Sequence, residues 1–286
     1  MSAPALRSSG SGLPPVRALA THFAFQFRST LRNPAQMLLS YLFPLGFYAF
    51  MGLVMTEINP GFRDSLLPSM TIFTVMTGAL LGLPGPLVDE RDAGIYRAYR
   101  VNGVPAGAVL AMPALTIGFH STIAAAIVAV TAVPLFGAPV PGSWVALVLA
   151  TLLGAAVFAA FGTLIGVVSS SSRATILFSQ AIFLPSMLLG GLMVPLETLP
   201  RGAQTAALLL PTTWLAQLEQ AAVYGRDTMV GPELAAVVLV LSAVVAFGVA
   251  AWSFNWDSRN VTRRGHPALA LLAIVPMVVG LLTTLT

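Results

Sequence analysis

The sequence predicts an all-α polytopic membrane protein, and three observations lead to that fold class. Hydrophobic residues make up 57% of the 286-residue chain and charged residues only 8%, whereas a typical soluble domain carries about 25% charged residues. The mean hydropathy is +0.87. Apolar runs of roughly 20 residues, the length that crosses a bilayer core as a helix, recur along the chain. A surface so poor in charge excludes a water-soluble globule.

The apolar runs predict one membrane domain over residues 16–256. Its six expected spans are about 37–56, 67–88, 106–132, 144–168, 174–195 and 234–252. Residues 1–15, rich in Ser, Gly and Pro, are predicted to be a disordered tail. Residues 257–286 are expected to form a cytoplasmic linker and an extra C-terminal apolar helix. This helix, 267–286, either crosses the bilayer as a seventh span or lies against the bundle.

The arginines predict the orientation, because all 14 basic residues are arginine. With the N-terminus in the cytoplasm, eleven of them lie on the cytoplasmic side: Arg7, Arg17, Arg28, Arg32, Arg91, Arg97, Arg100, Arg173, Arg259, Arg263 and Arg264. The other three are Arg63, Arg201 and Arg226. This bias favours a cytoplasmic N-terminus. The absence of lysine excludes a P-loop, which requires one, and the absence of cysteine excludes disulfides and thiolate metal sites.

An amphipathic helix is predicted just before the first span. Its apolar stripe is Val16, Ala20, Phe23, Phe27 and Leu31, and its polar stripe is Arg17, Thr21, Arg28 and Arg32. An apolar face beside an arginine face is typical of a helix in the membrane interface. The simpler alternative is a membrane anchor with no other role.

The segment between spans five and six, 196–233, is too polar to span and too apolar for a free loop. We expect short re-entrant helices that dip into the outer leaflet, with Trp214 and Tyr224 at the interface. Its carboxylates, together with Glu57 and Asp64, are interpreted as a solvated outer face: Glu197, Glu219, Asp227 and Glu233.

The loop after span two, 87–105, concentrates charge in an otherwise apolar chain. Acids come first and arginines follow, an order that suits the dipole of a short helix. We interpret it as a docking surface for a soluble partner, formed by Glu90, Arg91, Gly94, Tyr96, Arg97, Arg100 and Pro105. The alternative is a solvated loop that only satisfies the positive-inside rule.

The span interiors carry almost no charge, and no catalytic motif or metal-ligand cluster is evident. His120 is interpreted as a packing residue rather than a proton relay. Candidates for lining a transport path are Thr74, Thr77, Ser179 and Gln180. The small-residue pairs Gly78/Gly82 and Gly162/Gly166 predict close approach of helices.

These features together resemble the permease subunit of a bacterial type-2 class ATP-binding-cassette (ABC) exporter. The resemblance covers roughly 16–256. It depends on the order of the elements, on the stretch Gly190–Pro200, and on the loop motif Glu90, Arg91, Gly94, Arg97, Arg100, Val101, Gly103, Val104 and Pro105. The extra apolar helix departs from the family's pattern of six spans.

The resemblance implies that the loop carries a coupling helix that docks on a separate P-loop ATPase, which the interfacial helix also touches. It further implies that two permease chains, identical or related, pair in the bacterial cytoplasmic membrane, with spans one, two and five along the path. This chain would bind no cofactor and catalyse nothing, since ATP and Mg would be held by the ATPase. The expected cargo is a lipid, peptide or drug-like natural product. The alternatives are a gradient-driven carrier or channel, and a membrane scaffold or enzyme.

Overall fold

The computed structural model describes residues 15–257 and 266–285, with side chains from Phe23 to Asp257 and from His266 to Thr284. The predicted tail 1–15, apart from Pro15, and most of the predicted linker lie outside this part of the chain. Throughout the described residues the chain forms helices and loops and no strand, so the predicted all-α fold class is confirmed.

Seven helical stretches of the described residues are long and apolar enough to cross a membrane. They are Pro34–Ile58, Pro60–Asp92, Ala106–Phe136, Trp144–Val168, Ser172–Leu189, Pro232–Ser253 and Pro267–Thr284. Six of them match the spans predicted from hydropathy. The fifth is shorter than expected, because the helix stops at Leu189 and Gly191 adopts a left-handed conformation with φ of 83°.

The first half of the bundle contains an amphipathic helix and two interrupted spans. Its helices are α1 (Pro15–Arg32), α2 (Pro34–Met37), η1 (Leu38–Leu42), α3 (Phe43–Phe50), η2 (Met51–Met55), α4 (Thr56–Ile58), η3 (Pro60–Phe62), α5 (Arg63–Gly82), α6 (Pro84–Asp92), α7 (Ile95–Val101) and α8 (Ala106–Phe136). The π-helical turn η1 ends two residues before Pro44, which lacks the N–H that a regular helix needs.

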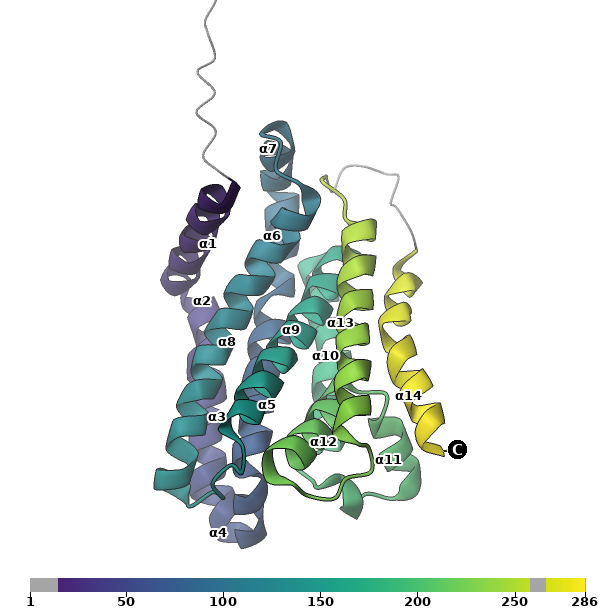
Figure 1. The fold of residues 1–286 in the computed structure, drawn as a ribbon. Coiled ribbons are helices and arrows are strands. Elements are labelled where there is room, and N and C mark those ends of the chain that lie inside the picture. Colours follow the sequence, from purple (N-terminus) through teal and green to yellow (C-terminus); the bar gives the residue numbers. More distant parts are fainter. Residues whose placement is uncertain (1–14, 258–265, 286) are drawn as a thin grey trace, which may run out of the picture.

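The second half holds the remaining spans and the short helices between spans five and six. They are α9 (Trp144–Val168), α10 (Ser172–Leu189), η4 (Leu196–Thr198), α11 (Arg201–Ala207), α12 (Pro211–Tyr224), α13 (Pro232–Ser253), η5 (Pro267–Ile274) and α14 (Val275–Leu285). The short helices confirm the expected helical character of 196–233. α11 and α12 lie at the end of the bundle opposite α7 (Figure 1).

Helix α5 is the centre of the bundle, and nearly all of its side chains are buried. Glycines bring α9 close to it. A Cβ on Gly162 would clash with the carbonyl oxygen of Ala79 on α5, and one on Gly166 would lie 2.8 Å from Leu87 Cδ1 on the neighbouring α6. The predicted close approach at these glycines is therefore confirmed, since the Ala79 backbone leaves no room for a side chain on Gly162, and Leu87 would have to shift to admit one on Gly166.

The C-terminal apolar helix packs along α13 as η5 and α14, and it runs from the α7 end toward the α11–α12 end (Figure 1). A Cβ on Gly280 would lie only 2.5 Å from the ring of Trp214 and 2.8 Å from Val238. The helix is thus packed against α12 and α13 along the length of the bundle, as a seventh span would be.

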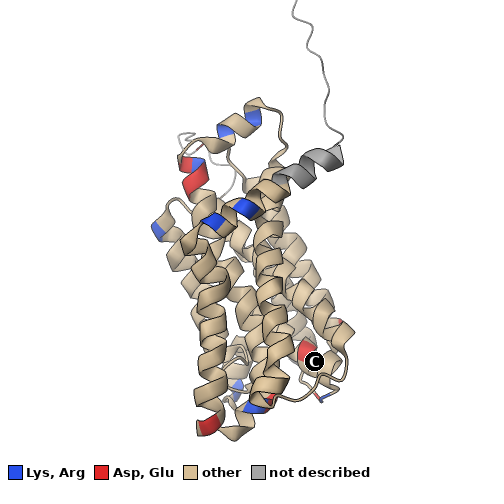
Figure 2. Cartoon of the chain, turned by 90° about the vertical axis from the view of Figure 1, so that its left-hand side faces the viewer, with Lys and Arg blue, Asp and Glu red and all other residues tan. Residues whose placement is uncertain are grey.

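Charged residues gather at the two ends of the bundle, and its middle is almost free of them (Figure 2). One end carries α1 and α7, and the other carries α4, α11 and α12 (Figure 1). This separation is what a bilayer requires, because a charge in the hydrocarbon core is costly.

Candidate functional site at the charged end of the bundle

The charged loop forms two short helices joined by a glycine turn. α6 ends with the N–H of Gly94 donating to Arg91 O at 3.1 Å, and Gly94 has φ of 75°. α7 ends at a second glycine, Gly103, with φ of 73°. There the N–H of Gly103 donates to Arg100 O and the N–H of Val104 donates to Tyr99 O. This pair of bonds closes the helix and satisfies its last carbonyls. Both turns depend on glycine, which adopts positive φ without a steric penalty.

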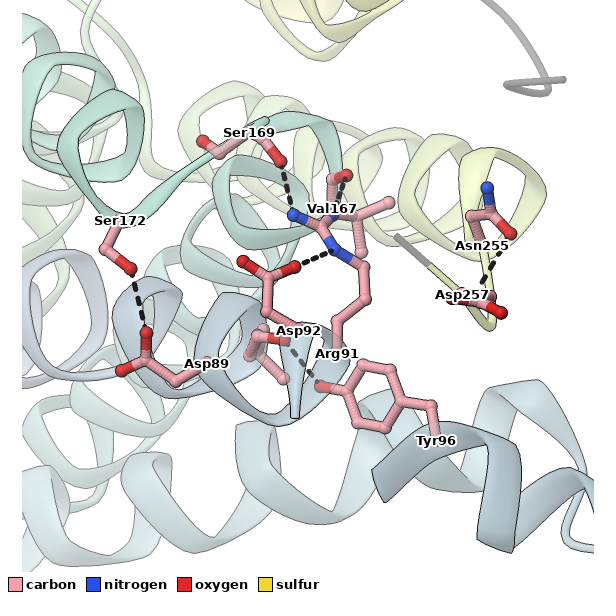
Figure 3. Close-up of polar contacts among 10 residues, drawn as sticks. Asp89, Arg91, Asp92, Tyr96, Val167, Ser169, Ser172, Asn255 and Asp257 are labelled. Carbon is pink, nitrogen blue, oxygen red and sulfur yellow. Dashed lines mark hydrogen bonds and ion pairs between the residues drawn. The ribbon is translucent and has the colours of Figure 1, made fainter. Parts of the chain in front are cut away.

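Arg91 connects the loop to the end of α9 (Figure 3). Its Nη2 donates to Ser169 O at 2.8 Å and its Nη1 to Val167 O at 3.4 Å, while Nε lies 3.6 Å from an oxygen of Asp92. The last carbonyls of a helix have no partner within the helix, and a cation stabilises that end. Arg91 is buried. It therefore joins α6 to α9. The sequence predicted that Arg91 is part of a docking surface, but the side chain does not lie on an exposed face.

A second contact joins the same loop to α10, the fifth span. Ser172 Oγ, in the first turn of α10, donates to Asp89 Oδ1 at 2.8 Å (Figure 3). Asp89 and Arg91 thus hold α6 against two successive spans. Displacement of the loop would be passed directly to α9 and α10.

Tyr96 fixes α7 to α6. Its hydroxyl donates to Leu87 O at 3.0 Å, and its ring packs 5.3 Å from the ring of Phe254. The side chain is 1% exposed, so Tyr96 is also a buried anchor and not a surface residue. Burial, the largest cause, raises the pKa of this phenol far above its ordinary value, so the hydroxyl stays a donor.

The chain after span six also contacts α7. Arg97 Nε lies 3.5 Å from Asp257 Oδ2, and Trp256 packs against Phe254. No contact between 254–257 and the loop was predicted from the sequence. A usable signal was present, because residues 254–257 follow span six at the end of the bundle where the loop also lies.

The exposed face of α7 combines arginines with apolar side chains. Arg97 and Arg100 are exposed, and so are Ile95 and Val101, at 40% and 86%. Figure 1 shows α7 projecting beyond the rest of the bundle. The exposed apolar pair was missed from the sequence, although the spacing of 95, 98 and 101 places these residues on one side of a helix. Pro105 is exposed at the end of the loop, whereas Glu90 is half-buried.

The apolar stripe of α1 packs on α8. The rings of Phe23 and Phe27 lie 6.0 and 5.8 Å from Phe119, and Phe27 stacks on His120 at 4.4 Å. The Nδ1 atom of His120 is 2.7 Å from the hydroxyl of Tyr41. These contacts favour the interpretation of His120 as a packing residue.

Arg28 and Arg32 are exposed on α1, while the side chain of Arg17 is not described. The apolar stripe is shorter than predicted, since Leu31 is 46% exposed. Whether α1 lies in a membrane interface stays a prediction.

The candidates for path lining are buried or half-buried within this single chain. Thr74 and Thr77 are 0% exposed, and their hydroxyls donate to carbonyls one turn earlier, Met70 O and Phe73 O. Ser179 is buried, and Gln180 is half-buried with a buried Oε1 that has no partner. The two threonines thus do not face a path in this conformation.

Two expectations about the outer segment are wrong. Trp214 is 0% exposed, and its Nε1 donates to Leu208 O at 2.7 Å, so it is a core residue and not an interface residue. Glu219 is likewise 0% exposed and does not belong to a solvated outer face. Both lie on α12, which packs against α9 and α13. Across the described residues no three His, Asp or Glu side chains are grouped to hold a metal ion.

Fold and site together define a polytopic permease with a rigid charged hairpin at one end, and comparison with known proteins agrees. Residues 17–224 match the family of ABC-2 type transporters. The chain is also 31% identical over 196 residues to YvfS of Bacillus subtilis (strain 168), whose name describes it as a transport permease, covering 65% of this chain and 78% of that protein. The chain therefore belongs to the ABC-2 type transporter family and is a membrane transport subunit.

Proposed function

We propose that the chain is the membrane-spanning subunit of an ATP-driven exporter and that α7 is the helix on which a separate ATPase docks. One observation carries the proposal: α7 projects beyond the bundle with two apolar side chains, Ile95 and Val101, exposed among arginines. An exposed apolar and cationic face on a rigid helix is suited to a protein partner.

The ties behind α7 supply a route for mechanical coupling. ATP and Mg would be bound by the partner, whose closure would push α7. Tyr96 holds α7 on α6, Arg91 joins α6 to α9, and Asp89 joins it to α10. A push on α7 would therefore move the cytoplasmic ends of α9 and α10 together. The exposed arginines of α1 would give the ATPase a second contact.

The assembly that follows contains two permease chains, identical or related, and two ATPase subunits in the bacterial cytoplasmic membrane, with the N-terminus inside. Support for that orientation is the excess of arginine at the α1–α7 end, which the positive-inside rule places in the cytoplasm. The cargo would be hydrophobic or amphipathic, such as a lipid, a peptide or a drug-like natural product. The near absence of charge inside the spans favours cargo of this class over a polyanion.

The test is purification of the tagged chain from its native membranes in a mild detergent, with mass spectrometry and an ATPase assay of the eluate. The proposal expects a P-loop protein in stoichiometric amount and ATP hydrolysis in the wild-type eluate. Arg97→Glu should lose both, whereas Arg201→Glu, an exposed arginine at the opposite end, should keep both. Recovery of the chain alone, with transport that depends on an ion gradient, would contradict the proposal and favour a gradient-driven carrier.

A further inference from the structure

Helix α12 contains a buried carboxyl group for which the coupling mechanism has no use. Glu219 is 0% exposed, although it lies in the segment between spans five and six. α12 packs against α5, α9, α10 and α13, which enclose the side chain. A buried carboxylate that lacks a cation is costly, and such groups usually keep their proton instead.

The contacts of Glu219 suit a protonated carboxyl group. Its Oε2 lies 3.3 Å from Thr71 Oγ1 on α5. That hydroxyl also lies 3.0 Å from Leu67 O and 2.9 Å from Pro68 O. Threonine has one proton, and the nearer carbonyls can accept it. A protonated Glu219 can then donate to Thr71 Oγ1, whereas an ionised one would compete with those carbonyls for the same proton.

No positive charge compensates Glu219 in the described part of the chain. α9 has no titratable residue, α13 has only Glu233 in its first turn, and α10 has Arg173 near its start at the far end of the bundle. α5 contributes Arg63 and Asp64, and Arg63 pairs with Glu57.

Two further groups lie at the end of α12 itself. The Tyr224 hydroxyl is buried without a partner, and Arg226 donates to Gln220 Oε1 at 2.8 Å and lies over the Tyr224 ring. The exposed Asp227 follows Arg226.

Burial, the main cause, holds the pKa of Glu219 well above its ordinary range. The second carboxyl oxygen of Glu219, Oε1, has no hydrogen-bond partner.

We propose that Glu219 and Thr71 form a proton-binding site that ties α12 to α5, and that opening of this end of the bundle releases the proton to water. The step is a simple transfer: the O–H bond of the Glu219 carboxyl breaks, and water accepts the proton. The carboxylate left behind is stable only in contact with water, so proton release favours α12 separated from α5.

The same helix forms one wall of a polar cavity of about 270 Å³, and this gives the tie a consequence. Thr213, Gln217 and Gln220 of α12 line that cavity together with Arg226 and Thr228. Glu219 is not among the lining residues and faces α5 instead. Separation of α12 from α5 would therefore reshape the cavity. Under the proposed function, this end of the bundle is the side where cargo leaves, so a role of the cavity in export rests on that function. The proton site does not rest on it.

The test is infrared spectroscopy of the purified full chain, because a protonated carboxylic acid gives a carbonyl band that a carboxylate lacks. The proposal expects such a band at neutral pH and its loss in Glu219→Gln. Glu197→Gln, which changes an exposed carboxylate of the same segment, should keep it. The band should shift in Thr71→Val, which removes the hydroxyl partner. A wild-type protein without the band, or a band unchanged in Glu219→Gln, would overturn the proposal.

Thermal unfolding over a pH series is a second measurement, and it remains informative if Glu219→Gln folds poorly. A carboxyl whose pKa is higher in the folded than in the unfolded state binds more protons when folded. Stability is then full below the unfolded value and falls as pH rises toward the folded value. The wild type should lose Tm over that window relative to Glu219→Gln, and parallel curves would contradict the proposal. Neither measurement needs the ATPase, so failure of one proposal can be told from failure of the other.

Discussion

The guanidinium of Arg91 donates a hydrogen bond of 2.8 Å to Ser169 O, the residue that caps the C-terminus of α9. This contact joins a loop to a span 78 residues later in the sequence. It places the cation where the helix dipole favours it and satisfies a carbonyl that the helix leaves unpaired. The loop is thereby a rigid part of the bundle and not a solvated connection.

Arg91→Ala should destabilise the folded chain by about 2 kcal/mol, because hydrogen bonds to charged groups contribute about 1.5–3 kcal/mol, and the buried Ser169 carbonyl and the half-buried Val167 carbonyl lose their donor. The free energy of unfolding in mixed micelles measures this. Arg100→Ala is the matched control: Arg100 is exposed, so its loss should change stability by less than about 0.5 kcal/mol. Equal effects of the two substitutions would show that the tie to α9 is not what makes Arg91 important.

Gly94→Ala should cost about 1–2 kcal/mol, since a left-handed conformation brings Cβ against the following carbonyl. The new Cβ would also lie 3.0 Å from Arg97 Nη2, so it would disturb the ion pair with Asp257. Gly107→Ala, in the first turn of α8 with open space around it, should be neutral or stabilising. Thermal unfolding compares the two, and an equally harmless Gly94→Ala would contradict the assigned turn.

Gly162→Ala should destabilise the bundle by about 1–3 kcal/mol, the usual cost of overpacking a tight interface. Its Cβ would clash with the backbone oxygen of Ala79, which cannot move aside as a side chain can. Gly118→Ala on α8 has nothing within 4 Å and should leave the Tm almost unchanged. A similar Tm for both variants would disprove the close approach of α5 and α9.

Val101→Asp should leave the chain folded, since Val101 is 86% exposed, yet should abolish ATPase binding if α7 is the docking helix. A charge at the centre of an apolar contact is strongly unfavourable. Ile58→Asp is the control, because Ile58 is 72% exposed at the opposite end. Co-purification of the ATPase with each variant is the measurement, and retention by Val101→Asp would refute docking through this face.

Hydropathy predicted the spans, because a run of apolar residues reports its own environment. The short outer helices and the close approach at Gly162 were also readable, since they depend on local composition and spacing. The roles of individual side chains were not. Arg91 and Tyr96 look like surface residues in the sequence, but their partners, Ser169 and Phe254, come from distant helices. Glu219 and Trp214 are buried only because α12 folds back against the spans, and no local sequence pattern indicates that packing.

The central claim, that a separate ATPase docks on α7, is tested most directly by site-specific cross-linking. The chain has no cysteine, so a single introduced thiol is a unique attachment point. Val101→Cys carrying a photoactivated cross-linker should capture a P-loop ATPase in native membranes, and Ile58→Cys should not. Capture of no ATPase from Val101, or equal capture from both positions, would contradict the account.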